Sequence, residues 1–325
     1  MTAYLLRRLF YALPILIGVN VLTFALFFMV NTPDDMARLH LGVKRVTPEA
    51  VEKWKAARGY DKPLFVNAAQ PGFGKFSDTI FFEKSLAMFA FDFGAADDGR
   101  AIGNEIKTRM WPSLAIALPT FVIGLMVNIT VALILLFFRH TYVEWGGVVL
   151  LVAMMSVSGL FYIIAGQFLF AKVWALAPIS GYQGGFNAAR FVWLPILVGV
   201  VGGIGAGARW YRTLFLEEAG KDYVRTARAK GLSEAAVLFR HILKNGMVPI
   251  LTGAVAVFPL LFMGSLILES FFGIPGLGSY TIDAINAQDF AIVRAMVFLG
   301  AVLYILGLIL TDISYTLVDP RVRLQ

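Results

Sequence analysis

Six long apolar runs constrain the fold of this chain more than any other feature. A helix needs roughly 20 residues to cross the hydrocarbon core of a bilayer, and each run meets or approaches that length. None carries Lys or Arg except at its ends. The runs are Leu9–Val30, Ser113–Phe138, Gly146–Phe170, Phe191–Ala208, Met247–Leu268 and Val293–Val318. The sequence therefore predicts an all-α integral membrane protein with six transmembrane helices. The lipid bilayer is the first partner that we expect for the chain.

The composition supports a lipid environment and excludes several kinds of site. The chain is 58% hydrophobic and 15% charged, whereas a soluble domain is about 45–50% apolar and about 25% charged. It has no cysteine, which rules out disulfides, thiolate metal ligands and cysteine catalysis. The three histidines, His40, His140 and His241, are far apart in the sequence. We therefore predict no catalytic residue, no metal site and no cofactor.

The basic residues predict the orientation of the spans. If the N-terminus is cytoplasmic, 13 of the 28 Lys and Arg residues flank the spans on the inner side, and three lie in the two short outer loops. The other twelve lie in residues 31–110 beside eleven acids, and a translocated segment of that length escapes the positive-inside rule. Both termini are therefore expected in the cytoplasm.

This orientation divides the chain into three parts. Residues 1–30 form an N-terminal segment with the first span, residues 31–110 a long extracytoplasmic loop, and residues 111–325 a five-helix core. Within the long loop, Thr47-Pro48-Glu49 predicts a helix start and Gly59 its end. The loop also carries an aromatic stretch that is too polar to span, and either the outer membrane face and neighbouring loops or a soluble partner would cover it. Its members are Phe81, Phe82, Phe89, Phe91 and Phe93.

The cytoplasmic loop, residues 209–246, carries eight of the basic residues. Its pattern predicts a helix over Glu217–Lys230 that ends at Gly231. Ser233 is expected to cap a second short helix, which places Arg240, His241 and Lys244 in the last turns before Asn245-Gly246. The predicted unit is thus two short helices joined by a tight turn and held between the fourth and fifth spans.

Three functions compete for this basic loop. Entry into a DNA groove is disfavoured because both ends are tethered to predicted spans, so no nucleic-acid partner is expected. Attraction to anionic lipid is the simplest interpretation. Docking of a cytoplasmic protein is the more specific one, because small residues admit a partner to the backbone while basic residues pair with its carboxylates. The small residues are Ala227, Ala229 and Gly231, and the basic ones are Arg225, Arg228 and Lys230.

The same loop resembles that of a known family. The run Asp222-Tyr223-Val224-Arg225-Thr226-Ala227-Arg228-Ala229-Lys230-Gly231-Leu232, with Phe239-Arg240-His241 and Lys244-Asn245 before Pro249, is similar to the coupling loop of bacterial ABC importer permeases. More narrowly, the run resembles that of the B-type permease subunits of the dipeptide, oligopeptide and nickel branch. Other stretches agree in order: Tyr4–Leu9, Gly59–Pro63, Glu269–Gly278 and Asp312–Arg323. Residues 64–110 match weakly, and Gly246 replaces a frequent alanine, which is expected to loosen the approach to the fifth span.

The resemblance implies a type I importer permease fold in the bacterial cytoplasmic (inner) membrane. It also implies a C-type permease, two cytoplasmic ATPase subunits and an extracytoplasmic solute-binding protein as partners. The residues it places in contact with the ATPase are Tyr223, Arg225, Thr226, Ala227, Arg228, Ala229, Lys230, Gly231 and Leu232. We expect the turn after the fifth span to form an outer gate or a contact for the binding protein, through Glu269, Gly273, Pro275, Gly276 and Gly278.

The function expected on these grounds is that of a peptide importer permease without enzymatic activity. The chain lacks the phosphate-binding pattern Gly-x-x-x-x-Gly-Lys-Ser/Thr, so nucleotide chemistry belongs to separate subunits. Import of nickel or another small solute stays open, because no charge pattern in the spans selects a substrate. An ion-coupled secondary transporter is less favoured, because such proteins place charged residues near the membrane midplane. A membrane protein with no transport role is the third class.

Overall fold

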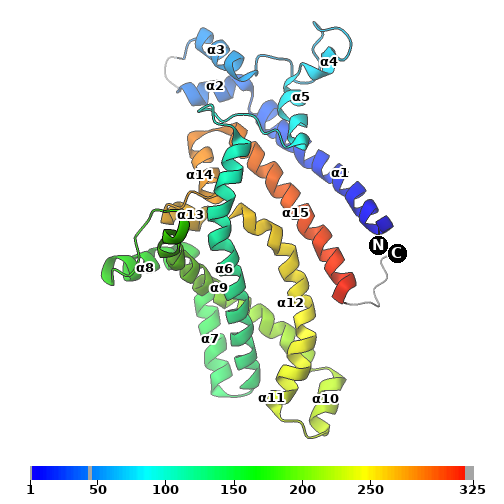
Figure 1. Ribbon diagram of the computed structural model, residues 1–325, viewed down its shortest axis with the longest axis vertical. Coiled ribbons are helices and arrows are strands. Elements are labelled where there is room, and N and C mark those ends of the chain that lie inside the picture. The colour runs from blue at the N-terminus through cyan, green and yellow to red at the C-terminus, as the bar shows by residue number, and fades with distance from the viewer. Residues whose placement is uncertain (1, 43–45, 319–325) are drawn as a thin grey trace. The chain divides into compact units, whose positions relative to one another are not determined.

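The computed structural model describes residues 2–42 and 46–318, and the regular elements in that part of the chain are helices (Figure 1). The C-terminal motif Asp319–Arg323, with the basic residues Arg321 and Arg323, lies outside the described residues. The chain divides into two compact units. The first comprises the described residues of Met1–Arg109 and Tyr280–Ile309, and the second comprises Met110–Ser279 with the described residues of Leu310–Arg323.

The first unit is built from the N-terminal span, the short helices of the long loop and most of the last span. Its elements are α1 (Thr2–Phe24), η1 (Ala25–Val30), α2 (Pro33–Leu41), α3 (Pro48–Arg58), α4 (Gly74–Ser77), α5 (Ile80–Lys84), η2 (Leu86–Ala90) and α15 (Phe290–Val318) as far as Ile309. It also holds the start of α6 (Ile102–Phe137) and the end of α14 (Leu277–Ala287).

The second unit holds the rest of α6 and the helices of the permease core. These are α7 (Tyr142–Ser156), α8 (Gly159–Gly166), η3 (Gln167–Val173), η4 (Gly185–Asn187), α9 (Ala188–Ala219), α10 (Asp222–Ala229), α11 (Glu234–Val237), η5 (Leu238–Ile242), α12 (Leu243–Val257), η6 (Phe258–Met263) and α13 (Leu266–Phe272).

Five helices in the described residues are long and apolar enough to cross a membrane: Phe10–Val30, Ile102–Phe137, Ala188–Ala219, Glu234–Met263 and Phe290–Ser314. A sixth candidate is the pair of segments Tyr142–Ser156 and Gly159–Val173, which meet at 90°. The prediction of six apolar helices is therefore confirmed as five unbroken helices and one broken one. The third run is not straight because Val157 and Ser158, with ψ angles of 130° and 141°, interrupt the helical backbone. The hydropathy of a run depends on its side chains and not on its backbone angles, so it does not reveal such a break.

Glycines along α9 set the packing of the second unit. A Cβ on Gly205 would stand 2.9 Å from the carbonyl oxygen of Leu151 in α7, and one on Gly207 would stand 2.3 Å from Nδ2 of Asn128 in α6. Small residues at helix contacts let the backbones approach closely, which favours van der Waals packing where lipid offers no hydrophobic driving force. The glycines of α9 therefore allow α6 and α7 to pack directly on it.

The long loop confirms the predicted helix start and stop. The Thr47 hydroxyl accepts a hydrogen bond from the Ala50 amide, Pro48 occupies the first turn of α3, and Gly59 ends the helix at φ 67°. A left-handed backbone of this kind favours glycine because it lacks Cβ. The loop packs on its own unit through its aromatic stretch. The Phe81 ring lies 5.0 Å from that of Phe24 in α1, and the Phe89 ring 5.3 Å from that of Phe298 in α15.

Candidate functional site

The predicted helix over Glu217–Lys230 is wrong at its start. Helix α9 continues from the fourth span to Ala219, so Glu217 belongs to its last turn, and the chain turns at Gly220-Lys221 before α10 begins at Asp222. Two acids in a row suggested a helix N-terminus, but the buried side chains of Phe215 and Ala219 hold α9 in its helical path. The fourth span therefore extends as far as Ala219 into the predicted cytoplasmic loop.

Helix α10 packs on this extension through two side chains. Val224 and Ala227, three residues apart on one helical face, are buried in a core with Phe215, Val237 and Leu238. The small side chain of Ala227 thus packs against the chain's own core, and its contact with an ATPase stays a prediction. Other predicted contact residues are exposed: Arg225, Thr226, Arg228, Ala229, Lys230, Gly231 and Leu232.

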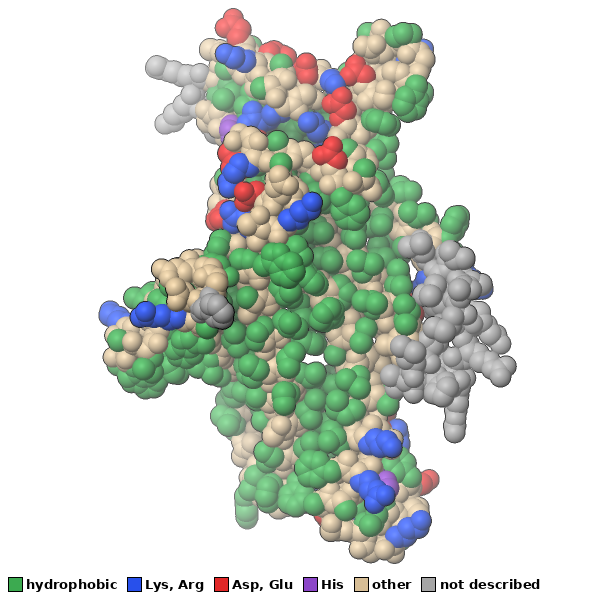
Figure 2. Space-filling model, viewed as in Figure 1, with side chains coloured by type: hydrophobic (Ala, Val, Ile, Leu, Met, Phe, Trp, Pro, Cys, Tyr) green, Lys and Arg blue, Asp and Glu red, His purple; other side chains and the backbone are tan. Residues whose placement is uncertain are grey.

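The α10–α11 hairpin (residues 222–237) lies at one end of the second unit, where Figures 1 and 2 show α10 beside α11 and a group of Lys and Arg side chains. The turn at Gly231 is confirmed. Gly231 has φ 78°, its amide donates to the Arg228 carbonyl at 2.9 Å, and the Leu232 amide donates to the Ala227 carbonyl at 3.4 Å. These two hydrogen bonds form a Schellman motif, which closes the C-terminus of α10.

The second helix of the loop begins as predicted and ends elsewhere. The Ser233 hydroxyl accepts a hydrogen bond from the Ala236 amide and so caps α11. The helix then continues through η5 and α12 as one candidate span, Glu234–Met263. Asn245-Gly246 does not end it, because packing against α9 overrides the local turn preference. The hairpin therefore continues into a span through α11, and a two-residue turn joins it to the other span, α9.

Gly246 brings these two spans together. It is buried in α12, and a Cβ there would stand 2.7 Å from Cδ1 and Cε1 of Phe215 in α9. Phe215 is itself fully buried. The expectation that this glycine loosens the approach to the fifth span is wrong: the missing methyl group lets α12 pack tightly on the ring.

Polar contacts brace the hairpin at both ends. The Arg228 guanidinium donates from Nε to Oε1 of Glu234 at 2.9 Å and from Nη2 to Oε2 at 3.0 Å, which joins α10 to α11. At the other end, the Tyr223 hydroxyl and the Lys221 ammonium donate to the nearly buried Glu218. Burial and the hydrogen bond to Glu218 raise the pKa of Tyr223 to about 12, so the phenol keeps the proton it donates. The sequence pattern missed Glu218 and Glu234 as parts of the site.

The turn after the fifth span forms around a buried carboxylate. Glu269 in α13 is 1% exposed and accepts hydrogen bonds from the amides of Ser265 at 3.1 Å and Ser279 at 3.0 Å. The Ser113 hydroxyl of α6 also bonds to this carboxylate and accepts from the Leu277 amide at 2.7 Å. Burial raises the pKa of Glu269, and these donors oppose the rise. Glu269 thus ties α13 and α14 to α6.

Glycines make room for that carboxylate. A Cβ on Gly264 would stand 1.9 Å from Oε1 of Glu269, and one on Gly276 2.2 Å from Oε2. A Cβ on Gly278 would stand 2.6 Å from the carbonyl of Ser265. Of the five residues predicted for an outer gate or partner contact, Glu269, Gly276 and Gly278 are therefore internal, whereas Gly273 and Pro275 are exposed. Ser113 was missed because nothing in the sequence links it to a residue 156 positions later.

No group of three or more Asp, Glu and His side chains in residues 2–42 and 46–318 is placed to hold a metal ion. The site is instead mechanical in character. Two spans end in one braced hairpin, and that hairpin presents basic side chains on its outer face. Such an arrangement is suited to holding another protein and transmitting its displacement to the spans.

Comparison with known proteins identifies the family. Residues 1–93 match the N-terminal domain of binding-protein-dependent transport system membrane components, and residues 108–324 match the domain described as the inner membrane component of these systems. The chain is 33% identical to the di/tripeptide transport system permease protein DppB of Pseudomonas aeruginosa (strain UCBPP-PA14), over the whole of both chains. It is 32% identical to a protein of Brucella abortus (strain 2308) provisionally named as a peptide transport system permease, over 99% of both chains.

A more distant relative is the oligopeptide transport system permease protein AppB of Bacillus subtilis (strain 168). It is 26% identical over 99% of this chain and the whole of its own length. The matches therefore cover the first span, the long loop and the helical core alike. By its sequence, its apolar helices and these matches, the chain belongs to the family of binding-protein-dependent transport system inner membrane components, and it is a multi-pass inner membrane protein.

Proposed function

We propose that this chain is the B-type permease subunit of an ATP-driven peptide importer and that the α10–α11 hairpin is where a cytoplasmic ATPase docks. The peptide assignment is supported by the names of the relatives, which include di/tripeptide, dipeptide and oligopeptide permeases. The coupling role is supported by the residues themselves. Both termini would lie in the cytoplasm, as the distribution of basic residues favours.

One observation carries the coupling role: the hairpin has no flexible link to the membrane. Helix α9 leads into it through two residues, and α11 continues into the fifth span without a break in the helix. The buried pair Val224 and Ala227 fixes α10 on the α9 extension. A displacement imposed on the hairpin therefore moves both spans together, which is what switching between outward and inward exposure requires.

The chain needs partner subunits because its sequence has no pattern for binding and hydrolysing ATP. It has no phosphate-binding pattern Gly-x-x-x-x-Gly-Lys-Ser/Thr, so we assign ATP hydrolysis to two separate subunits. A second permease of the C type would complete the pathway, and an extracytoplasmic solute-binding protein would deliver the substrate. The exposed residues Gly273 and Pro275 are the part of the outer turn that such a protein reaches.

Reconstitution tests this proposal. The chain, its C-type partner and the two ATPases would be purified together, placed in liposomes, and given a dipeptide-loaded binding protein and ATP. We expect ATP-dependent uptake of the dipeptide and faster ATP hydrolysis in its presence. Uptake of Ni²⁺ with no uptake of dipeptide would show that the transported substrate is the metal ion and not a peptide. Uptake driven by an ion gradient in the isolated chain would overturn the ATP-driven function.

A further inference from the structure

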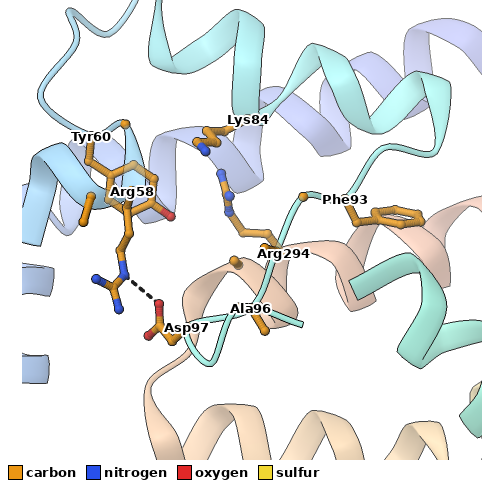
Figure 3. A pocket seen from close by; sticks show the side chains of 13 residues that line it. Arg58, Tyr60, Lys84, Phe93, Ala96, Asp97 and Arg294 are labelled. Carbon is orange, nitrogen blue, oxygen red and sulfur yellow. Dashed lines mark hydrogen bonds and ion pairs between the residues drawn. The ribbon is translucent and has the colours of Figure 1, made fainter. Parts of the chain in front are cut away.

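The first unit contains a cavity of about 530 Å³ whose lining residues all belong to that unit (Figure 3). Its floor and walls come from four parts of that unit: the end of α3 with the two residues after it, the end of α5, the loop before α6, and α15. The side chains on which the argument rests are Tyr60, Lys84, Phe93, Asp97 and Arg294. Exposed residues at Gly94, Ala95 and Gly99 form its rim, so the cavity opens to the surface of the unit.

Arg294 is a buried cation that forms no ion pair with a carboxylate of the described residues. It is 3% exposed, and its Nε has no hydrogen-bond partner among the described residues. Its guanidinium carbon lies 4.7 Å from the centre of the Phe28 ring, a cation–π contact, and Asp289 attracts the charge without forming an ion pair with it. A buried guanidinium with an unpaired donor is costly unless an anion accepts from it. The Arg294 side chain can therefore donate a hydrogen bond to an anionic group of a bound ligand.

Lys84 adds a second positive charge to the same space. In Figure 3 the Lys84 nitrogen and the Arg294 guanidinium point toward one another within the cavity. Burial and the charge of Arg294 lower the pKa of Lys84. Two cations that face each other repel, so their placement is unfavourable until an anion lies between them.

The nearby acids are already engaged. Asp97 pairs with Arg58 at 2.7 Å and with His40 at 3.3 Å. Glu83, the neighbour of Lys84, pairs with Lys62. Asp289 accepts hydrogen bonds from the amides of Asp97 at 2.7 Å and Ile292 at 3.2 Å. Glu83 and Asp92 attract Lys84, and Asp289 attracts Arg294, but no carboxylate in residues 2–42 and 46–318 forms an ion pair with either cation, so both can still pair with a ligand.

The walls indicate a ligand larger than an inorganic ion. Tyr60 and Phe93 are buried aromatic side chains that line the cavity, and they offer apolar contact to an organic body. A volume of about 530 Å³ falls in the range of small-molecule sites and far exceeds what an inorganic anion fills. We propose that this cavity binds a small organic carboxylate, with Arg294 and Lys84 holding the carboxylate and Tyr60 and Phe93 contacting the apolar part.

Calorimetric titration of the purified full chain in nanodiscs tests the site. The probes are N-acetyl-phenylalanine and its amide, which differ only in the carboxylate. We expect the acid to bind at least about tenfold more tightly than the amide, the loss typical of a charge-assisted hydrogen bond. Equal binding of acid and amide would overturn the proposal, and so would displacement of the acid by equimolar inorganic phosphate.

Variants show whether binding occurs in this cavity. Lys84→Met and Arg294→Met should each weaken binding of the acid at least about tenfold, while Lys75→Met, at an exposed lysine of the same unit outside the cavity, should leave it unchanged. Arg294→Met removes a buried unpaired charge, so its thermal stability should be equal to or above that of the wild type.

Wild-type affinity in both cavity variants would overturn the proposal. The proposal would also be overturned if the cavity retained phosphatidylglycerol and the titration with N-acetyl-phenylalanine gave no heat of binding. The result does not depend on the coupling function, because the α10–α11 hairpin is unchanged in these variants.

Discussion

Arg228 and Glu234 are joined by two parallel hydrogen bonds, Nε to Oε1 at 2.9 Å and Nη2 to Oε2 at 3.0 Å, across the turn that contains Gly231. Both side chains are exposed, by 45% and 62%, so the pair contributes only about 0–1 kcal/mol to stability. The geometry matters more than the energy. A bidentate pair orients the guanidinium across the turn, while the buried core of Val224, Ala227, Val237 and Leu238 holds α10 against α11.

Exchanging these two charges separates a structural role from a contact role. In the double variant Arg228→Glu with Glu234→Arg, the pair can form again, but the charge on the face of α10 is reversed. We expect insertion and thermal stability close to wild type, and loss of most substrate-stimulated ATP hydrolysis in the reconstituted complex, because an ATPase carboxylate at this position would now be repelled. Full activity of the double variant would limit Arg228 to a structural role.

The backbone at Gly231 provides a second test of the hairpin. Its φ of 78° disfavours a side chain by about 1–2 kcal/mol, and a Cβ at this position would have no atom within 4 Å, so only the backbone opposes substitution. Gly231→Val should abolish substrate-stimulated ATP hydrolysis while the protein remains in the membrane. Gly231→Asn is the matched control, because Asn tolerates this conformation, and it should retain most of the stimulation. Equal activity of the two variants would show that the turn is not needed for coupling.

Two glycines of α12 should respond in opposite ways to the same change. Gly246→Ala places a methyl group 2.7 Å from the buried Phe215 ring and should lower the free energy of unfolding by about 1–3 kcal/mol. Gly253→Ala, with no atom within 4 Å of its Cβ, should leave stability unchanged or raise it by up to about 1 kcal/mol. Thermal unfolding of the purified variants compares them. A Gly246→Ala variant as stable as Gly253→Ala would contradict close packing of α12 on α9.

Glu269 should make stability depend on pH. Burial raises its pKa above the ordinary value of 4.5, so the folded protein holds this proton where the unfolded chain has lost it. The free energy of unfolding should therefore fall as pH rises from 4.5 through the raised pKa. Glu269→Gln keeps the shape of the side chain and cannot titrate, so its unfolding temperature should change less over that window.

Asp283→Asn is the control for this measurement, because Asp283 is an exposed carboxylate in α14. Its unfolding temperature should follow the wild-type pH profile. If the Glu269→Gln profile also follows the wild type, the carboxyl of Glu269 does not determine the dependence.

Local patterns in the sequence sufficed wherever neighbouring residues decide the structure. Runs of about 20 apolar residues determined the spans, because lipid accepts little else. Thr47 and Ser233 marked helix starts, and Gly59 and Gly231 marked helix ends, because capping depends on a few adjacent groups. The resemblance of Tyr223–Leu232 and of the other motifs then determined the family.

The tertiary structure decided whatever joins residues far apart in the chain. Asn245-Gly246 has the local signature of a turn, but the ring of Phe215 makes it a helical contact. Ala227 resembles an open docking position until Val237 and Leu238 cover it. Ser113 is part of the outer turn because it bonds to Glu269, and Lys84 is part of the proposed carboxylate site because it lines the same cavity as Arg294. Burial and unbalanced charge belong to packed neighbours rather than to residue types, so only the folded chain reveals them.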